Sequence, residues 1–398
     1  MRSIALWSAI SAAVVSASET KTTADYIQVP APWRVGHCIK EYCNFANPTI
    51  GDGLVLISNP GNIDILNSFS ALTKTNSEPP PFEVHEIPGK GIGLIANRTI
   101  QRGEVVMQYT PSLVVQFGPH IDLPASDREA FYQDAVNQLS AARQEFFMAQ
   151  YGKDIYTKID RNAFRMFING QNPYSGHLGV FPEVSRLNHD CRPNLNSRIE
   201  NITHTTTAVR PILPGEELTI SYIDGLLPLH SRQERLQDWR FNCTCSLCSS
   251  SPSEIAASDA RIQAIRDLEE ELDKAVGGGD LTTEMGERLV KLYREERLQT
   301  YIGHAYTKAA LIYAMFGVEG KAKEYAGLAA DAMAMELGEE AGDVVAMREL
   351  AERTREHWAW EVRKAKVEEK NDEGNGVQEE NKEKAQEEQD REGVKDEL

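Results

Sequence analysis

Four of the six cysteines in the chain have the type and spacing of a metal site. Three of them, Cys243, Cys245 and Cys248, share one short loop (CTCSLC), and Cys191 lies far earlier in the sequence. A structural zinc ion takes four tetrahedral ligands, so Cys191 is the obvious fourth. Zinc there would clip the loop onto the middle of a domain and supply folding energy rather than catalysis. Disulfides are the alternative, and they too would need Cys191.

Three further segments carry residues suited to binding and chemistry. Residues 89–94 (GKGIGL) form a glycine-rich turn, residues 186–194 (RLNHDCRPN) surround Cys191, and residues 215–222 (GEELTISY) end in a tyrosine. Glycine lets a bulky ligand approach the main chain.

These four segments, in this order, resemble a SET-domain protein-lysine methyltransferase. The cysteine spacing and the helical C-terminus make the chain most similar to the SET-and-MYND family and its fungal SET relatives. The resemblance covers roughly residues 82–248. It departs from the family at Asp190, where a serine is usual, and in lacking a MYND zinc module, since residues 94–161 hold no cysteine or clustered histidine.

The resemblance implies S-adenosylmethionine as the methyl donor and zinc as a structural ion. Carried onto matching positions, the glycine turn lines the cofactor through its backbone, and the Asn-His pair holds the adenosine and amino-acid ends. An aromatic ring before the cysteine loop stacks on adenine, and one asparagine lies near the cofactor. The implied cofactor-binding residues are Lys90, Gly91, Ile92, Gly93, Asn162, Asn188, His189, Tyr222 and Phe241.

Tyr222 is the implied catalytic residue. A neutral lysine amine attacks a methyl group on a sulfonium, and the leaving thioether needs no acid. The protein must align the two partners and accept a lysine without its proton, a form that burial favours. A phenol oxygen beside the methyl can contact its polarised C–H groups. The alternative is that Tyr222 is a core tyrosine at the end of a strand. For Asn188 and His189, the alternative is a turn whose polar groups are already hydrogen-bonded.

Neighbouring residues have plainer interpretations. Trp239 is either a wall of the cofactor or lysine channel or an anchor of its loop. Glu216 and Glu217 mimic a paired-carboxylate site, but a turn leading into a strand explains them better.

The predicted fold is α+β, with a β-rich domain followed by an all-α domain. We expect a SET domain with its post-SET zinc loop over residues 81–248, because short β-rich runs separated by glycine turns begin at Phe82. Residues 127–151 read as helical. Residues 254–366 form helices; a pair at 306–317 and 321–337 is similar to tetratricopeptide packing, with a plain bundle as the alternative.

Residues 19–80 form an N-terminal region without strong periodicity. Cys38 and Cys43 lie within it, and they either form a local disulfide or remain two buried free thiols. A bridge is favoured if the chain enters an oxidising compartment.

The chain has 398 residues, 41% of them hydrophobic, which suffices for two domains with a sizeable core. The net charge of −18 argues against a nucleic-acid-binding surface. An acidic surface suits a basic protein partner such as a lysine-rich peptide. No stretch after the N-terminal one is long and apolar enough to span a membrane.

The two ends of the chain carry targeting signals. Residues 1–18 read as a signal peptide, and residues 367–398 form a disordered acidic tail that ends in the retention address Lys-Asp-Glu-Leu. Together they predict the lumen of the endoplasmic reticulum, with nucleus or cytoplasm as the alternative. Rival functions are a non-catalytic SET module that binds a partner peptide, and a methyltransferase acting on a luminal protein or a small amine.

Overall fold

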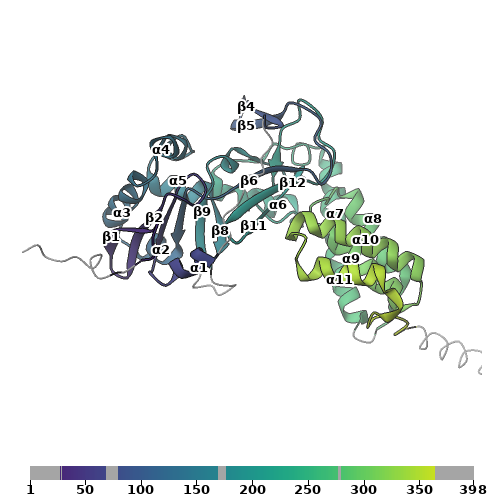
Figure 1. The fold of residues 1–398 in the computed structure, drawn as a ribbon. Coiled ribbons are helices and arrows are strands. Elements are labelled where there is room, and N and C mark those ends of the chain that lie inside the picture. Colours follow the sequence, from purple (N-terminus) through teal and green to yellow (C-terminus); the bar gives the residue numbers. More distant parts are fainter. Residues whose placement is uncertain (1–26, 28, 69–78, 169–175, 277–278, 364–398) are drawn as a thin grey trace, which may run out of the picture.

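The computed structural model describes residues 27, 29–68, 79–168, 176–276 and 279–363. The predicted signal peptide and acidic tail lie outside these residues. A strand-rich half is followed along the chain by a helical half, and the two lie side by side (Figure 1). The predicted α+β class, with an all-α C-terminal part, is confirmed.

The largest sheet combines strands from both sides of the boundary placed before residue 81. Its order is β1 (Arg34–Ile39), β2 (Tyr42–Asn47), β3 (Leu54–Ser58), β7 (Leu113–Gln116), β9 (Gly176–Val180) and β8 (Ala163–Phe167). The β3–β7 pair is parallel and the other pairs are antiparallel. The segment before residue 81, for which no regular pattern was predicted, is therefore structural and completes this sheet.

Strand β3 shows how the sheet is buried on both faces. Val55 and Ile57 point to a core shared with α3 (Ala125–Asn137) and α5 (Ile155–Asn162). Leu54 and Leu56 pack on the opposite side with α1 (Asn62–Ser68). This two-residue alternation with apolar residues throughout is what a strand covered on both faces requires.

Two short helices flank this sheet near the predicted helical segment 127–151. They are α2 (Phe117–Asp122) and α4 (Ala141–Met148). The single predicted helix is in fact two, because α3 ends at Asn137 and Ser140 caps α4 by accepting a hydrogen bond from the Arg143 backbone N–H.

Three smaller sheets position the motif segments. The pair β4 (Phe82–Ile87) and β5 (Gly91–Ala96) is a hairpin around the glycine turn. Strands β11 (Leu195–Glu200), β12 (Thr203–Ala208) and β6 (Val105–Tyr109) form the second sheet. The short 3-10 helix η3 (Val184–Arg186) leads into the second motif. Strand β10 (Asn188–His189) runs parallel to β13 (Thr219–Ile220), so the second and third motifs lie side by side.

Helices make up the remainder. After α6 (Leu229–Leu236) and η4 (Gln237–Trp239) come α7 (Pro252–Val276), α8 (Thr283–Glu295), α9 (Ile302–Met315), α10 (Glu319–Leu337), α11 (Gly342–Glu352) and η5 (Thr354–Glu356). The predicted helix pair corresponds to α9 and α10, whose contact is lined by small residues such as Ala305, Ala309, Ala326 and Ala329.

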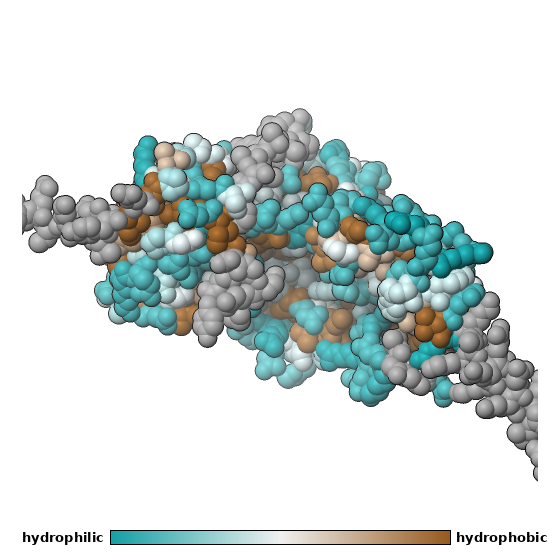
Figure 2. Space-filling model, turned by 60° about the horizontal axis from the view of Figure 1, so that its bottom comes forward, coloured by the Kyte–Doolittle hydropathy of each residue, from teal (hydrophilic) through white to brown (hydrophobic). Residues whose placement is uncertain are grey.

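On the face in Figure 2, hydrophilic side chains dominate the helical half, and the surface is hollowed between the two halves. Among the described helices, none has both the length and the apolar character that crossing a bilayer needs.

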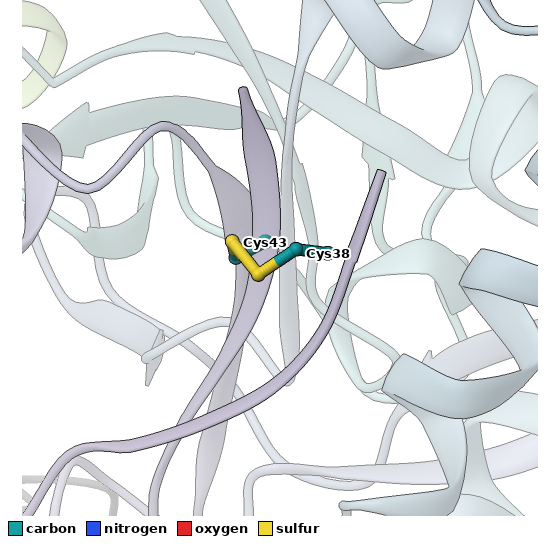
Figure 3. Close-up of a disulfide and its surroundings, with 2 residues drawn as sticks. All are labelled: Cys38 and Cys43. Atoms are coloured by element: carbon teal, nitrogen blue, oxygen red, sulfur yellow. A yellow bond between two sulfur atoms is a disulfide. The ribbon is translucent and has the colours of Figure 1, made fainter. Parts of the chain in front are cut away.

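The N-terminal cysteines are joined. Cys38 on β1 and Cys43 on β2 are cross-strand partners and form a disulfide (Figure 3). The bridge, rather than two free thiols, is therefore the outcome, and it closes a very short hairpin.

Candidate active site

The four cysteines of the predicted metal site converge in space. The Sγ atoms of Cys191, Cys243, Cys245 and Cys248 all lie within 4.8 Å of one another. The Cys191 sulfur is 3.5 Å from that of Cys248 and 3.9 Å from that of Cys243. Four thiolates around a zinc ion at about 2.3 Å stand about 3.8 Å apart, so the residues fit this ion.

The four sulfurs are close enough to hydrogen-bond with one another. These bonds lower the pKa of Cys245 and raise the pKa of Cys191, so the thiols of the cluster share their protons. Cys191, Cys243 and Cys245 are buried, which excludes competing water. Alternative disulfide pairing is not what the structure shows, because all four cysteines are free thiols.

A cavity of about 970 Å³ lies beside the cluster and collects the other motifs. Such a volume is at the upper end of the ~300–1,000 Å³ typical of ligand sites. Eight of the nine predicted cofactor-binding residues line it: Lys90, Gly91, Ile92, Asn162, Asn188, His189, Tyr222 and Phe241. Gly93 does not. A single cavity therefore brings together residues from five separate segments.

The glycine turn places main chain at the cavity wall. Gly91 has φ +76°, a left-handed conformation that side-chain-bearing residues rarely adopt, and a Cβ atom added there would meet nothing within 4 Å. Gly93 lies just outside the lining residues. A Cβ atom there would lie 2.8 Å from the Asn188 amide nitrogen, so Gly93 makes room for Asn188 instead of lining the cavity.

Glu217 connects two of the predicted residues. Its carboxylate pairs with Lys90 Nζ at 2.6 Å and accepts a hydrogen bond from Asn188 Nδ2 at 2.9 Å. Glu216 pairs instead with Arg210 at 2.7 Å. The two glutamates are thus no paired-carboxylate site, as predicted, but the role of Glu217 was missed.

His189 links the cysteine cluster to Tyr222. Its Nδ1 accepts the Tyr222 backbone N–H at 3.1 Å, so Nε2 carries the proton and faces the Cys191 sulfur at 3.3 Å. Burial lowers the pKa of His189 to about 4, which keeps the ring neutral. Because both ring nitrogens are engaged, contact with a ligand is left to the main chain and the ring face.

Tyr222 has its phenol fixed at the cavity. The hydroxyl donates to the Leu187 carbonyl oxygen at 2.7 Å. Burial, then the charge of Glu217, raise the pKa of Tyr222 above its ordinary value, so the phenol keeps its proton. The rings of His189 and Trp239 lie 5.4 and 5.5 Å from the tyrosine ring.

Comparison with known proteins agrees with this geometry. Residues 91–223 match the family model of the SET domain. The match covers about a third of the chain. The match includes Gly91, Asn188, His189 and Tyr222 and stops before the cysteine loop, which the structure attaches through Cys191.

Curated relatives share this part of the chain. It is similar to N-lysine methyltransferase SMYD2 of Homo sapiens, 28% identical over 202 residues that cover 46% of this chain and 45% of the relative. For SMYD2-B and SMYD2-A of Danio rerio the identities are 35% and 39%, over 44% and 31% of this chain and 41% and 28% of theirs. The matched region thus spans less than half of these relatives. The predicted relationship to SET-domain lysine methyltransferases is confirmed.

Aromatic residues line the cavity on the side of the cysteine loop. Phe241 has its ring 6.2 Å from that of His189 and 6.4 Å from that of Tyr222. Trp239 lines the same cavity, which favours its interpretation as a channel wall. Asn162 also lines the cavity, at the end of α5, where its amide donates to the Tyr151 and Lys158 carbonyl oxygens.

A buried ion cluster joins the strand-rich half to the helical half. Arg192, next to Cys191, donates to the Glu296 carboxylate at 2.5 Å and to its carbonyl oxygen at 2.7 Å. Glu296 also accepts from Ser258 and Arg261 of α7. The side chains of Arg192 and Glu296 are 4% and 1% exposed. Sequence reasoning missed this pair, since nothing near either residue indicates the other.

Proposed function

We propose that this protein is an S-adenosylmethionine-dependent protein-lysine N-methyltransferase. The observation that carries the proposal is the convergence of Gly91, Asn188, His189 and Tyr222 on one cavity beside a four-cysteine cluster. The SET-domain match and the relatives named as N-lysine methyltransferases support it.

The residues at the cavity fit the cofactor. Open main chain at Gly91 allows close approach of a bulky ligand, and the Phe241 ring offers a face for stacking a base. Asn188 is held by Glu217 and by the Ile92 carbonyl oxygen, so its position is set before any ligand binds. Zinc held by the four cysteines would fix the loop that carries Phe241.

S-adenosylmethionine supplies a methyl group on a sulfonium centre. The protein orients the acceptor and keeps water away, while a lysine amine entering the cavity loses its proton to solvent, because burial disfavours the ammonium form. Tyr222 contributes a neutral phenol whose hydrogen is committed to Leu187, so its oxygen lone pairs can accept weak C–H contacts. Trp239, whose ring lies 5.5 Å from that of Tyr222, would flank the acceptor side chain in the cavity.

Calorimetry and a transfer assay test the proposal together. The purified protein should bind S-adenosylmethionine and form methyllysine on a peptide library. Tyr222→Phe should slow transfer by roughly tenfold or more, about 1.4 kcal/mol in the barrier, and leave cofactor affinity nearly unchanged. An inability to bind the cofactor would refute the proposal. Binding without transfer to any peptide would favour the non-catalytic rival.

Location in the endoplasmic reticulum stays a prediction. Asn201-Ile202-Thr203 is a glycosylation sequence, and Asn201 is exposed at the turn between β11 and β12. Luminal entry would allow a glycan there. A mobility shift of the native protein on glycosidase treatment, lost in Asn201→Gln, would support the luminal location; a missing shift would favour nucleus or cytoplasm.

A further inference from the structure

The charge of the cavity wall is opposite to that of the chain. The chain as a whole has a net charge of −18. Yet among the residues that the structure describes, the cavity lining includes no aspartate or glutamate, and it includes five cations: Lys90, Arg161, Arg165, Arg186 and Arg240. The cavity is therefore a local positive region in an acidic protein.

Two of the five cations are paired. Lys90 lies 2.6 Å from Glu217, and Arg161 lies 3.3 Å from Asp160. Within the part of the chain that the structure describes, no ion pair neutralises Arg165, Arg186 or Arg240. Three positive charges thus remain at the wall.

Aromatic rings hold two of these guanidinium groups in place. Arg165 of β8 lies 5.2 Å from the centroid of the Phe117 ring, and Arg186 of η3 lies 5.2 Å from that of Phe146. A ring face orients a guanidinium without cancelling its charge. Arg165 and Arg186 are therefore positioned but available to an anion.

We propose that the peptide substrate carries aspartate or glutamate beside its acceptor lysine, and that Arg165, Arg186 and Arg240 select it. This inference rests on the proposed methyltransferase function. Flanking carboxylates can form bidentate pairs with guanidinium groups. The same cations favour the neutral amine of the acceptor lysine, which the transfer requires. Net charge alone predicts the opposite preference, for a lysine-rich partner.

Matched peptides test the selection directly. Short peptides with one central lysine, flanked by aspartate and glutamate, by asparagine and glutamine, or by arginine, are compared by kcat/KM. The acidic peptide should be preferred over the basic one by about tenfold or more, and the preference should shrink as salt increases. Equal use of the three peptides, or preference for the basic one, would overturn the inference.

Charge-reversal variants assign the effect to the wall. Arg165→Glu and Arg186→Glu should lower kcat/KM for the acidic peptide about tenfold and raise it for the basic peptide. Arg102→Glu, on the exposed turn before β6, changes net charge equally and should alter neither. Thermal melting shows whether each variant is folded. If the charge-reversal variants are unfolded, the neutral variants Arg165→Gln and Arg186→Gln take their place in the same comparison. A control that behaves like the wall variants would contradict the inference.

Two outcomes separate this inference from the function beneath it. If cofactor binds but every peptide stays unmodified, the proposed function fails, whatever the charge of the peptides. If peptides are methylated without regard to flanking charge, only the inference fails. A competition experiment covers nucleic acid as the alternative ligand of the cations. If single-stranded RNA displaces the acidic peptide in a salt-sensitive way, and an excess of an acidic peptide without lysine does not, the cations bind nucleic acid and the inference is overturned.

Discussion

The chain is tied to itself by cysteine at two places, and the two ties differ in reach. The disulfide Cys38–Cys43 joins residues separated by 5 positions on adjacent strands. The cluster at Cys191 joins residues separated by 52 and 57 positions and brings the Phe241 loop onto the cavity. The first tie restrains a hairpin that its own strand pairing already forms. The second would become a tie through a bound zinc ion, which would hold the site together.

The difference shows that the effect of a cross-link on stability and activity depends on the length of chain that it encloses and on the residues that it positions. Closing a longer loop removes more freedom from the unfolded chain, although only as the logarithm of its length. The location of the cross-link has a further effect on the site, because the Cys191 sulfur lies beside His189, whose ring accepts a hydrogen bond from the Tyr222 backbone. We expect perturbations of the long-range tie to affect activity, and those of the local tie to affect stability alone.

Removing one cluster ligand should have the largest effect. Cys191→Ser should abolish zinc binding, measured by metal analysis, and reduce methyl transfer by about a hundredfold or more, since the loop carrying Phe241 is released. Ser246→Ala, exposed in the same loop, is the matched control and should behave as wild type. Full zinc content in Cys191→Ser would show that the cluster does not bind as described.

Glu296→Gln tests a second long-range tie, built from charge. The change leaves Arg192 buried beside an uncharged amide, and breaking a buried pair typically costs about 3–5 kcal/mol. The loss should appear as a lower denaturation midpoint in urea. Glu295→Gln removes only an exposed 3.8 Å pair with Lys291 and should cost well under about 1 kcal/mol. Equal midpoints for the two variants would remove the distinction between buried and exposed ties.

The stability of the fold should also depend on pH through His204, a residue outside both cysteine sites. His204 is fully buried between the rings of Phe164 and Phe181, and burial lowers its pKa to about 3. The unfolded chain takes up a proton below about pH 6.5, whereas the folded chain does not, so stability falls with pH between about 6.5 and 3. His204→Leu should remove about 2 kcal/mol of the loss between pH 7.5 and 5, measured by denaturant unfolding. Parallel curves for the variant and the wild type would contradict this.

The local tie should matter least. Replacing both Cys38 and Cys43 with alanine should cost about 2 kcal/mol of stability, the entropic estimate for so short a loop. Cofactor affinity and transfer should be unchanged, as measured at a temperature where both proteins are folded. A large loss of activity would show that the N-terminal hairpin contributes to the cavity after all.

The sequence predicted the parts of the site that follow from rigid chemistry. A zinc ion demands four ligands, so three clustered cysteines point to Cys191, and the glycine turn and the Asn-His pair follow a family pattern. What it missed depends on pairing across distance. Neither Lys90 with Glu217 nor Arg192 with Glu296 leaves a local signal, because opposite charges are common everywhere on a surface. The strands before residue 81 were missed because β1 and β2 mix polar and apolar residues, and only their pairing through β3 with β7 reveals them.

The pairing of β3 with β7 sets a lower limit on what can be excised from this protein. The family-matched stretch, residues 91–223, receives the β3 edge of its sheet from upstream, and Arg192 receives its counter-charge from downstream. A fragment limited to residues 91–223 would lack β3, which leaves the edge of β7 unpaired, and it would lack Glu296, which leaves Arg192 without its counter-charge. The smallest autonomous unit is therefore considerably longer than the segment by which the family is recognised.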